Sequence, residues 1–181
     1  MVEKSMKVIE LPDGVNASLN GQILLIKGPK GEVTKTIKQH DISIEVSNKK
    51  ILLKSDGDTK KIKKMVGTLT AHIKNMIKGS LQNHVYILKI CSGHFPMNAS
   101  VSGDKFIVKN FLGEKVPRTL KLKSNANLRV EGDLVYVTST NKETAGQISA
   151  DIEQLTKRPG YDTRIFQDGI YITNKDGKEL K

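Results

Sequence analysis

One segment in the second half of the sequence combines cationic side chains with residues typical of rigid loops. In residues 109–118, which read KNFLGEKVPR, Lys109, Lys115 and Arg118 surround Gly113 and Pro117. A guanidinium can bind a phosphate through two parallel hydrogen bonds, whereas an ammonium acts as a point charge. A basic loop whose backbone can approach closely suits the sugar–phosphate backbone of folded RNA. This segment is therefore the first candidate for a binding site.

A second basic segment, residues 157–161, reads KRPGY and contains Lys157, Arg158 and Tyr161. The Pro and Gly favour a loop, and the ring of Tyr161 can stack on a base or a ribose. The alternative is that this ring packs over the end of a helix. Phe166 and Tyr171 follow closely and alternate with isoleucines. We therefore predict that Phe166 and Tyr171 belong to the core.

The net charge of +11 comes from different cationic residues in the two halves of the chain. Residues 1–82 contain 15 Lys and Arg against 8 Asp and Glu (net +7), and residues 83–181 contain 15 against 11 (net +4). Every arginine falls in the second part, while a predicted helix in the first part is rich in lysine. Because it holds the arginines, we expect the less charged half to make the more specific phosphate contacts. For the lysine-rich helix, the alternative to RNA binding is that its lysines simply form a solvated face. The arginines are Arg118, Arg129, Arg158 and Arg164.

Motifs for catalysis and for metal or cofactor binding are missing from the sequence. Cys91 and His94 have the spacing of half a zinc site, but no second pair follows. Residues 78–80, KGS, have the wrong order for a phosphate-binding loop, and no Gly-x-Ser-x-Gly motif occurs. No apolar run approaches the roughly 18 residues of a membrane span, and no signal-peptide pattern opens the chain. We therefore expect a protein that is not an enzyme, that binds no metal, cofactor or small-molecule substrate, and that does not associate with a membrane. The single cysteine and the composition indicate a soluble protein of the reducing cytosol.

The elements that must position these loops occur twice along the chain. Residues 15–21, VNASLNG, match residues 97–103, MNASVSG, at an offset of 82. Further matches follow in the same order at offsets of 84 and 79, and such small drifts are what loop insertions and deletions produce. We infer two tandem copies of one unit, covering residues 1–82 and 83–181.

Each copy contains short strand-like runs followed by one amphipathic helix. The helices are predicted at Lys60–Ile77 and Lys142–Thr156, with Thr59 and Asn141 as N-caps and glycines 79 and 160 near their ends. An antiparallel sheet packed with one helix, present twice, is an α+β fold. The strand-like runs are Val15–Leu19, Ile23–Lys27, Val33–Ile37, Ile42–Val46 and Ile51–Lys54 in the first copy; Ala99–Val101, Lys105–Lys109, Arg118–Leu122, Leu128–Val130 and Leu134–Thr138 in the second; Arg164–Phe166 and Ile170–Thr173 in a tail after the second helix; and Val85–Ile90, a weaker counterpart of that tail that bridges the two copies.

Several stretches together resemble the L-six family of large-subunit ribosomal proteins in its archaeal and eukaryotic form. The likeness keeps its order over almost the whole chain. Its tail differs from the shorter, Gly- and Lys-rich ending of bacterial members, which favours an archaeal source. The stretches are IKGPKGE at residues 26–32, GTLTAHIKNMIKG at 67–79, HFPM at 94–97, NFLGEKVPR at 110–118 and RIFQDGIY at 164–171.

The resemblance implies a structural protein of the cytoplasmic ribosome with two homologous α+β domains. Its partners would be large-subunit ribosomal RNA and neighbouring large-subunit proteins, near the factor-binding region with the sarcin-ricin loop and the stalk base. In that family the second domain is the main RNA-binding half. The residues implied to contact RNA are Lys109, Asn110, Lys115, Arg118, Lys157, Arg158, Tyr161, Arg164 and Gln167.

Two other functions remain open from the sequence. One is a free-standing RNA-binding or chaperone module outside the ribosome, which the charge and the loops would equally serve. The other is an enzyme acting on nucleic acid, for which the sequence offers neither clustered carboxylates nor a nucleophile beside a base.

Overall fold

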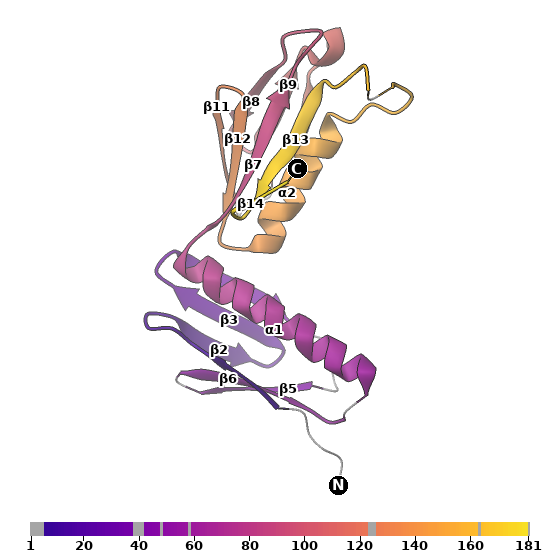
Figure 1. The fold of residues 1–181 in the computed structure, drawn as a ribbon. Coiled ribbons are helices and arrows are strands. Elements are labelled where there is room, and N and C mark those ends of the chain that lie inside the picture. Colours follow the sequence, from indigo (N-terminus) through magenta and orange to yellow (C-terminus); the bar gives the residue numbers. More distant parts are fainter. Residues whose placement is uncertain are drawn as a thin grey trace. The chain divides into compact units, whose positions relative to one another are not determined.

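The computed structural model describes residues 6–37, 42–47, 49–57, 59–122, 126–162 and 164–180. The chain divides into two compact units, unit 1 (Met1–Asn83) and unit 2 (His84–Lys181), shown in Figure 1. Each unit combines antiparallel sheets with one α-helix, which confirms the predicted α+β class. Neither helix is long and apolar enough to span a bilayer, as far as the described residues extend.

Unit 1 contains two three-stranded antiparallel sheets and helix α1 (Lys60–Leu81). Alternate side chains of the strands face one core, where Leu24, Ile26, Ile51 and Leu53 are fully buried. The first sheet, in the order β1-β6-β5, comprises β1 (Met6–Glu10), β6 (Lys50–Ser55) and β5 (Ile42–Ser47). The second, in the order β2-β3-β4, comprises β2 (Asn16–Asn20), β3 (Ile23–Gly28) and β4 (Gly31–Thr36).

Helix α1 begins where the sequence predicts and ends later. The side chain of Thr59 accepts a hydrogen bond from the Ile62 amide (3.3 Å), as an N-cap does. The helix continues through Gly79, which was predicted near its end, because this turn packs closely against the β3–β4 turn. A Cβ placed on Gly28 would lie 2.7 Å from the carbonyl oxygen of Ser80, and that oxygen accepts a bond from the Lys30 amide (3.0 Å). The absence of a side chain at Gly28 therefore lets the β3–β4 turn approach the backbone of α1 at Ser80.

Unit 2 repeats this plan with a larger second sheet. Helix α2 (Lys142–Leu155) starts at Asn141, whose side chain accepts a bond from the Glu143 amide (2.9 Å). The small sheet, in the order β10-β9-β8, comprises β10 (Arg118–Lys121), β9 (Lys105–Lys109) and β8 (Asn98–Ser102). The large sheet, in the order β11-β12-β7-β13-β14, comprises β11 (Asn127–Glu131), β12 (Leu134–Ser139), β7 (His84–Cys91), β13 (Gly169–Lys175) and β14 (Lys178–Glu179).

The structure departs from the predicted single sheet per copy. Each unit has two sheets, because each sheet has one apolar face and the two faces together with the helix enclose one core. The run Val85–Ile90, predicted as a bridge between the copies, is part of the central strand β7 of the large sheet and pairs with both β12 and β13. Its alternate residues Tyr86, Leu88 and Ile90 are buried in the core of unit 2.

The segment Arg164–Phe166 is a turn, contrary to the strand predicted there. The amides of Ile165 and Phe166 both donate to the carbonyl oxygen of Asp162 (3.1 and 2.9 Å). The Asp162 carboxylate accepts further bonds from the backbone and the guanidinium of Arg164. These local bonds satisfy the groups that a strand would have offered to a neighbour.

Candidate nucleic-acid interface

Three loops of unit 2 meet at one end of the domain. They are residues 93–97, the β9–β10 connection 110–117 with its 3₁₀ turn η1 (Phe111–Gly113), and the described part of the α2–β13 connection, 156–162 and 164–168. Figure 1 shows the last two at the same end of the sheet. The Asn110 side chain donates to the Pro96 carbonyl (3.0 Å), and Arg118, at the start of β10, donates to the Leu155 carbonyl (2.7 Å). We call these loops the loop surface.

The β9–β10 loop is held in an uncommon backbone conformation. Asn110, Leu112 and Gly113 have φ values of 59°, 47° and 77°, in the left-handed region. Asparagine and glycine tolerate this region, whereas leucine occupies it at a cost. The fully buried ring of Phe111 anchors the turn in the core.

Arg118 forms the centre of an ion-pair network. Its Nε and Nη2 donate to the two carboxylate oxygens of Glu114 (2.8 and 2.7 Å), and its guanidinium carbon lies 4.3 Å from the centre of the Phe111 ring. Arg158 donates to the same carboxylate (3.2 Å). Hydrogen bonding from Arg118 is the main reason that the pKa of Glu114 is lowered. The fork of Arg118 therefore ties the loop to the end of α2 instead of facing outward.

A second anchor joins residues 93–94 to the start of β13. The buried carboxylate of Asp168 accepts bonds from the amides of Gly93 and His94 (2.8 and 3.0 Å) and pairs with His94 Nδ1. Burial alone would raise the pKa of Asp168, but the hydrogen bonds from His94 and Gly93 outweigh it and lower the pKa. The Nδ1 atom of His94 is therefore occupied by its contact with the Asp168 carboxylate. In the described parts of the chain no cluster of His, Cys, Asp and Glu could hold a metal ion.

The predicted contact residues fall into two groups. Arg118 and Arg158 belong to the network around Glu114, and Arg164 pairs with the neighbouring Asp162, whose pKa this hydrogen bond lowers. The other predicted residues are exposed on the loop surface or its borders, and the lysines among them have no ion pair with another described residue. This second group is Lys109, Asn110, Lys115, Lys157, Tyr161 and Gln167.

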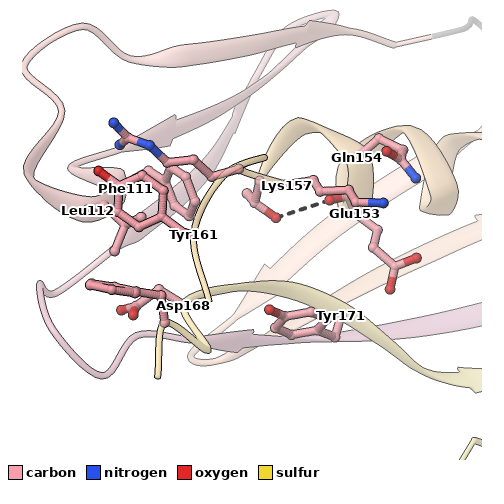
Figure 2. Close-up of a pocket in the computed structure, with 11 residues that line it drawn as sticks. Phe111, Leu112, Glu153, Gln154, Lys157, Tyr161, Asp168 and Tyr171 are labelled. Carbon is pink, nitrogen blue, oxygen red and sulfur yellow. Dashed lines mark hydrogen bonds between the residues drawn. The ribbon is translucent and has the colours of Figure 1, made fainter. Parts of the chain in front are cut away.

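A pocket of about 250 Å³ opens in the loop surface (Figure 2). It lies between η1, the end of α2 and the start of β13, and Tyr161, Phe166 and Tyr171 are among its lining residues. The prediction that Tyr171 is in the core was wrong, because its neighbour Ile170 takes the inward position on β13 and leaves Tyr171 41% exposed. Phe166, also predicted in the core, is only half-buried.

The sequence analysis missed most of the residues that line this pocket. They come from segments far apart in the chain, and only the alternation along β13 could have indicated that Tyr171 faces outward. The missed residues are Phe111, Leu112, Glu153, Gln154, Thr156, Phe166, Asp168 and Tyr171.

The fold and this surface define a class of protein: a basic, internally duplicated α+β chain whose second unit presents exposed lysines on anchored loops. A family profile described as "Ribosomal protein L6" matches residues 11–82 and 95–169, one segment in each copy. The chain belongs to the ribosomal protein L6 family.

Archaeal relatives cover nearly the whole chain. It is 40% identical to "Large ribosomal subunit protein uL6" of Methanothrix thermoacetophila over 175 residues, which is 97% of this chain and 99% of the relative. It is 44% identical to the protein of the same name from Methanococcus vannielii over 172 residues, 95% of this chain and 94% of the relative. The resemblance inferred from the sequence motifs is confirmed.

Proposed function

We propose that the loop surface of unit 2 binds large-subunit ribosomal RNA. As a ribosomal protein L6, the chain is a structural constituent of the large ribosomal subunit and not an enzyme. The proposal adds the part of the molecule that contacts RNA. It also places the chain near the factor-binding region, beside the sarcin-ricin loop and the stalk base with its neighbouring proteins, as the family resemblance implies.

The observation that carries the proposal is a set of exposed lysines, on or beside the loop surface, that have no ion-pair partner among the described residues. Lys109, Lys115 and Lys157 are exposed and come from two segments of the chain, residues 109–118 and 157–161. The Glu114 network and the Asp168 anchor hold their loops in place before any ligand binds. Loops that are already ordered lose little conformational entropy on binding, so more of the phosphate attraction appears as affinity.

The structure changes the role that we assign to the arginines. The guanidinium of Arg118 donates its hydrogen bonds to the Glu114 carboxylate and the Leu155 carbonyl, and the side chain is only 24% exposed. It therefore acts on RNA by positioning the loop that carries Lys115. Direct phosphate contact then falls mainly to the lysines and to Arg164, whose side chain remains exposed beside Asp162.

The test measures how salt affects binding of the full chain to protein-free large-subunit RNA. The RNA is transcribed from the ribosomal RNA gene of the genome that encodes the chain. Replacing Lys109, Lys115 and Lys157 by alanine together should lower the slope of log K against log salt by about 3, roughly 1 for each phosphate contact. A matched variant replaces three exposed lysines of α1, Lys60, Lys61 and Lys64. Equal losses from both triple variants would refute the assignment to unit 2.

Footprinting and sedimentation test the location. Hydroxyl-radical cleavage of subunits that lack or contain the chain should show protection at the sarcin-ricin loop and the stalk base, and protection confined to other regions would contradict that part of the proposal. In cell extracts the chain should sediment with large subunits. A dominant free pool would favour the alternative of a free-standing RNA-binding module.

A further inference from the structure

Half of the aromatic rings of this chain line a single pocket. The sequence has four Phe, four Tyr and no Trp, and the pocket of the loop surface contains Phe111, Tyr161, Phe166 and Tyr171. The chain has few aromatic residues, yet four of them gather at the end of unit 2 that carries the exposed lysines. Such a cluster suits a ligand with a flat face. Figure 2 shows the rings of Tyr161 and Tyr171 on either side of the α2–β13 connection.

These rings are held in position while part of their surface remains open. The His94 ring stacks on Phe166 at 4.8 Å, and Phe166 meets Tyr161 edge-on at 4.9 Å between ring centres. Tyr161 and Tyr171 are both about two-fifths exposed. Rings fixed by their neighbours can stack on a ligand with little loss of side-chain entropy.

Charge divides the pocket into an acidic interior and a basic rim. The carboxylates of Glu153 and Asp168 lie among the lining residues, where they accept bonds from the Ile172 amide and from residues 93–94. At the rim Lys157 is exposed and the Arg158 guanidinium lies 4.6 Å from the centre of the Tyr161 ring. The carboxylates repel a phosphate inside the pocket, whereas the rim attracts phosphates just outside it.

We propose that this pocket binds one unpaired nucleobase of the RNA. The base would lie against the exposed tyrosine rings, with Lys157 and Arg158 beside the flanking phosphates. Unstacked bases of loops and bulges are recognised by aromatic side chains and arginine planes in this way. The volume of about 250 Å³ is below the roughly 300–1,000 Å³ of sites for drug-sized ligands, so it suits one ring system. The inference rests on the proposed RNA-binding function and adds a specific site to it.

The first test is zero-length ultraviolet crosslinking of the full chain to deproteinised large-subunit RNA, with the crosslinked residue mapped by mass spectrometry. The crosslink should fall on Tyr161 or Tyr171 and identify a nucleotide that is unpaired in the RNA. Crosslinks confined to residues outside the pocket would overturn the inference. This measurement uses the unmodified chain, so it remains decisive if a pocket variant fails to fold.

The second test measures the affinity of tyrosine variants for the same RNA. Tyr161→Ala and Tyr171→Ala should each weaken binding by about 5- to 150-fold, the range for loss of one base–aromatic stack. The salt slope should not change, because no charge is lost. Tyr161→Phe keeps the ring and should bind within about twofold of the unmodified chain. Tyr136→Ala, on β12 and outside the pocket, is the matched control.

The outcomes separate this inference from the function on which it rests. If the unmodified chain does not bind the RNA, the proposed function fails. If it binds and both tyrosine-to-alanine variants bind equally well, only the nucleobase site fails. If those variants bind RNA normally but assemble poorly into subunits reconstituted with the other proteins, the pocket takes a protein side chain and the inference is overturned.

Discussion

Replacing Arg118 by lysine tests whether this residue positions the loop surface or binds phosphate. The change keeps the positive charge but removes the planar fork. In the structure that fork makes two bonds to Glu114 and one to the Leu155 carbonyl, all of 2.7–2.8 Å, and lies over Phe111. A lysine can keep one of these contacts at most.

The magnitude follows from the partial exposure of the pair. A hydrogen bond to a charged group contributes about 1.5–3 kcal/mol, while exposed ion pairs contribute about 0–1 kcal/mol. The side chains of Arg118 and Glu114 are 24% and 29% exposed, between these limits. We expect Arg118→Lys to lower the free energy of unfolding of unit 2 by about 1–3 kcal/mol, and its urea midpoint by roughly 1 M.

The chain itself supplies a probe for unit 2. All four tyrosines lie in unit 2 and the chain has no tryptophan, so intrinsic tyrosine fluorescence during urea unfolding follows this unit alone. Arg129→Lys is the control, because Arg129 is 78% exposed and makes one long bond (3.3 Å) to Glu131; its effect should stay within about 0.5 kcal/mol. If Arg118→Lys unfolds at the same urea concentration as the parent yet loses RNA affinity, the positioning role is refuted.

Two other predictions concern acid and close packing. The pKa values of Glu114 and Asp168 are lowered in the folded state, so both stabilise unit 2 above their unfolded-state pKa values and lose that effect as the pH falls through the folded ones. The fluorescence midpoint should therefore fall below about pH 4.5, and less steeply in Glu114→Gln and Asp168→Asn; equal slopes would contradict this. Gly28→Ala should destabilise unit 1 by about 1–3 kcal/mol, seen by circular dichroism, without moving the tyrosine transition. Gly67→Ala, in α1 with open space around it, should instead stabilise by about 0.5–1 kcal/mol, and matching effects at the two glycines would contradict the close contact.

Local patterns in the sequence identify most of the secondary structure. Thr59 and Asn141 cap the helices as predicted, because an N-cap depends on neighbours within one turn. The end of α1 was missed, because the helix continues past Gly79 to a contact between Ser80 and the distant β3–β4 turn. The turn at Arg164–Phe166 was missed as well, because a short apolar run does not reveal whether a strand is free to pair with it.

What the sequence alone determined was the duplication, the α+β class, the family and the basic segments, because these depend on residue order, periodicity and charge. Only the tertiary structure decided which cations face outward. Arg118 is directed inward by its ion pair with Glu114, and the same carboxylate also pairs with Arg158, which lies 44 residues after Glu114 in the chain. The tertiary structure likewise gathered Phe111, Tyr161 and Tyr171 into one pocket. Such contacts join residues distant in the chain, and their geometry is set by packing, which no local pattern encodes.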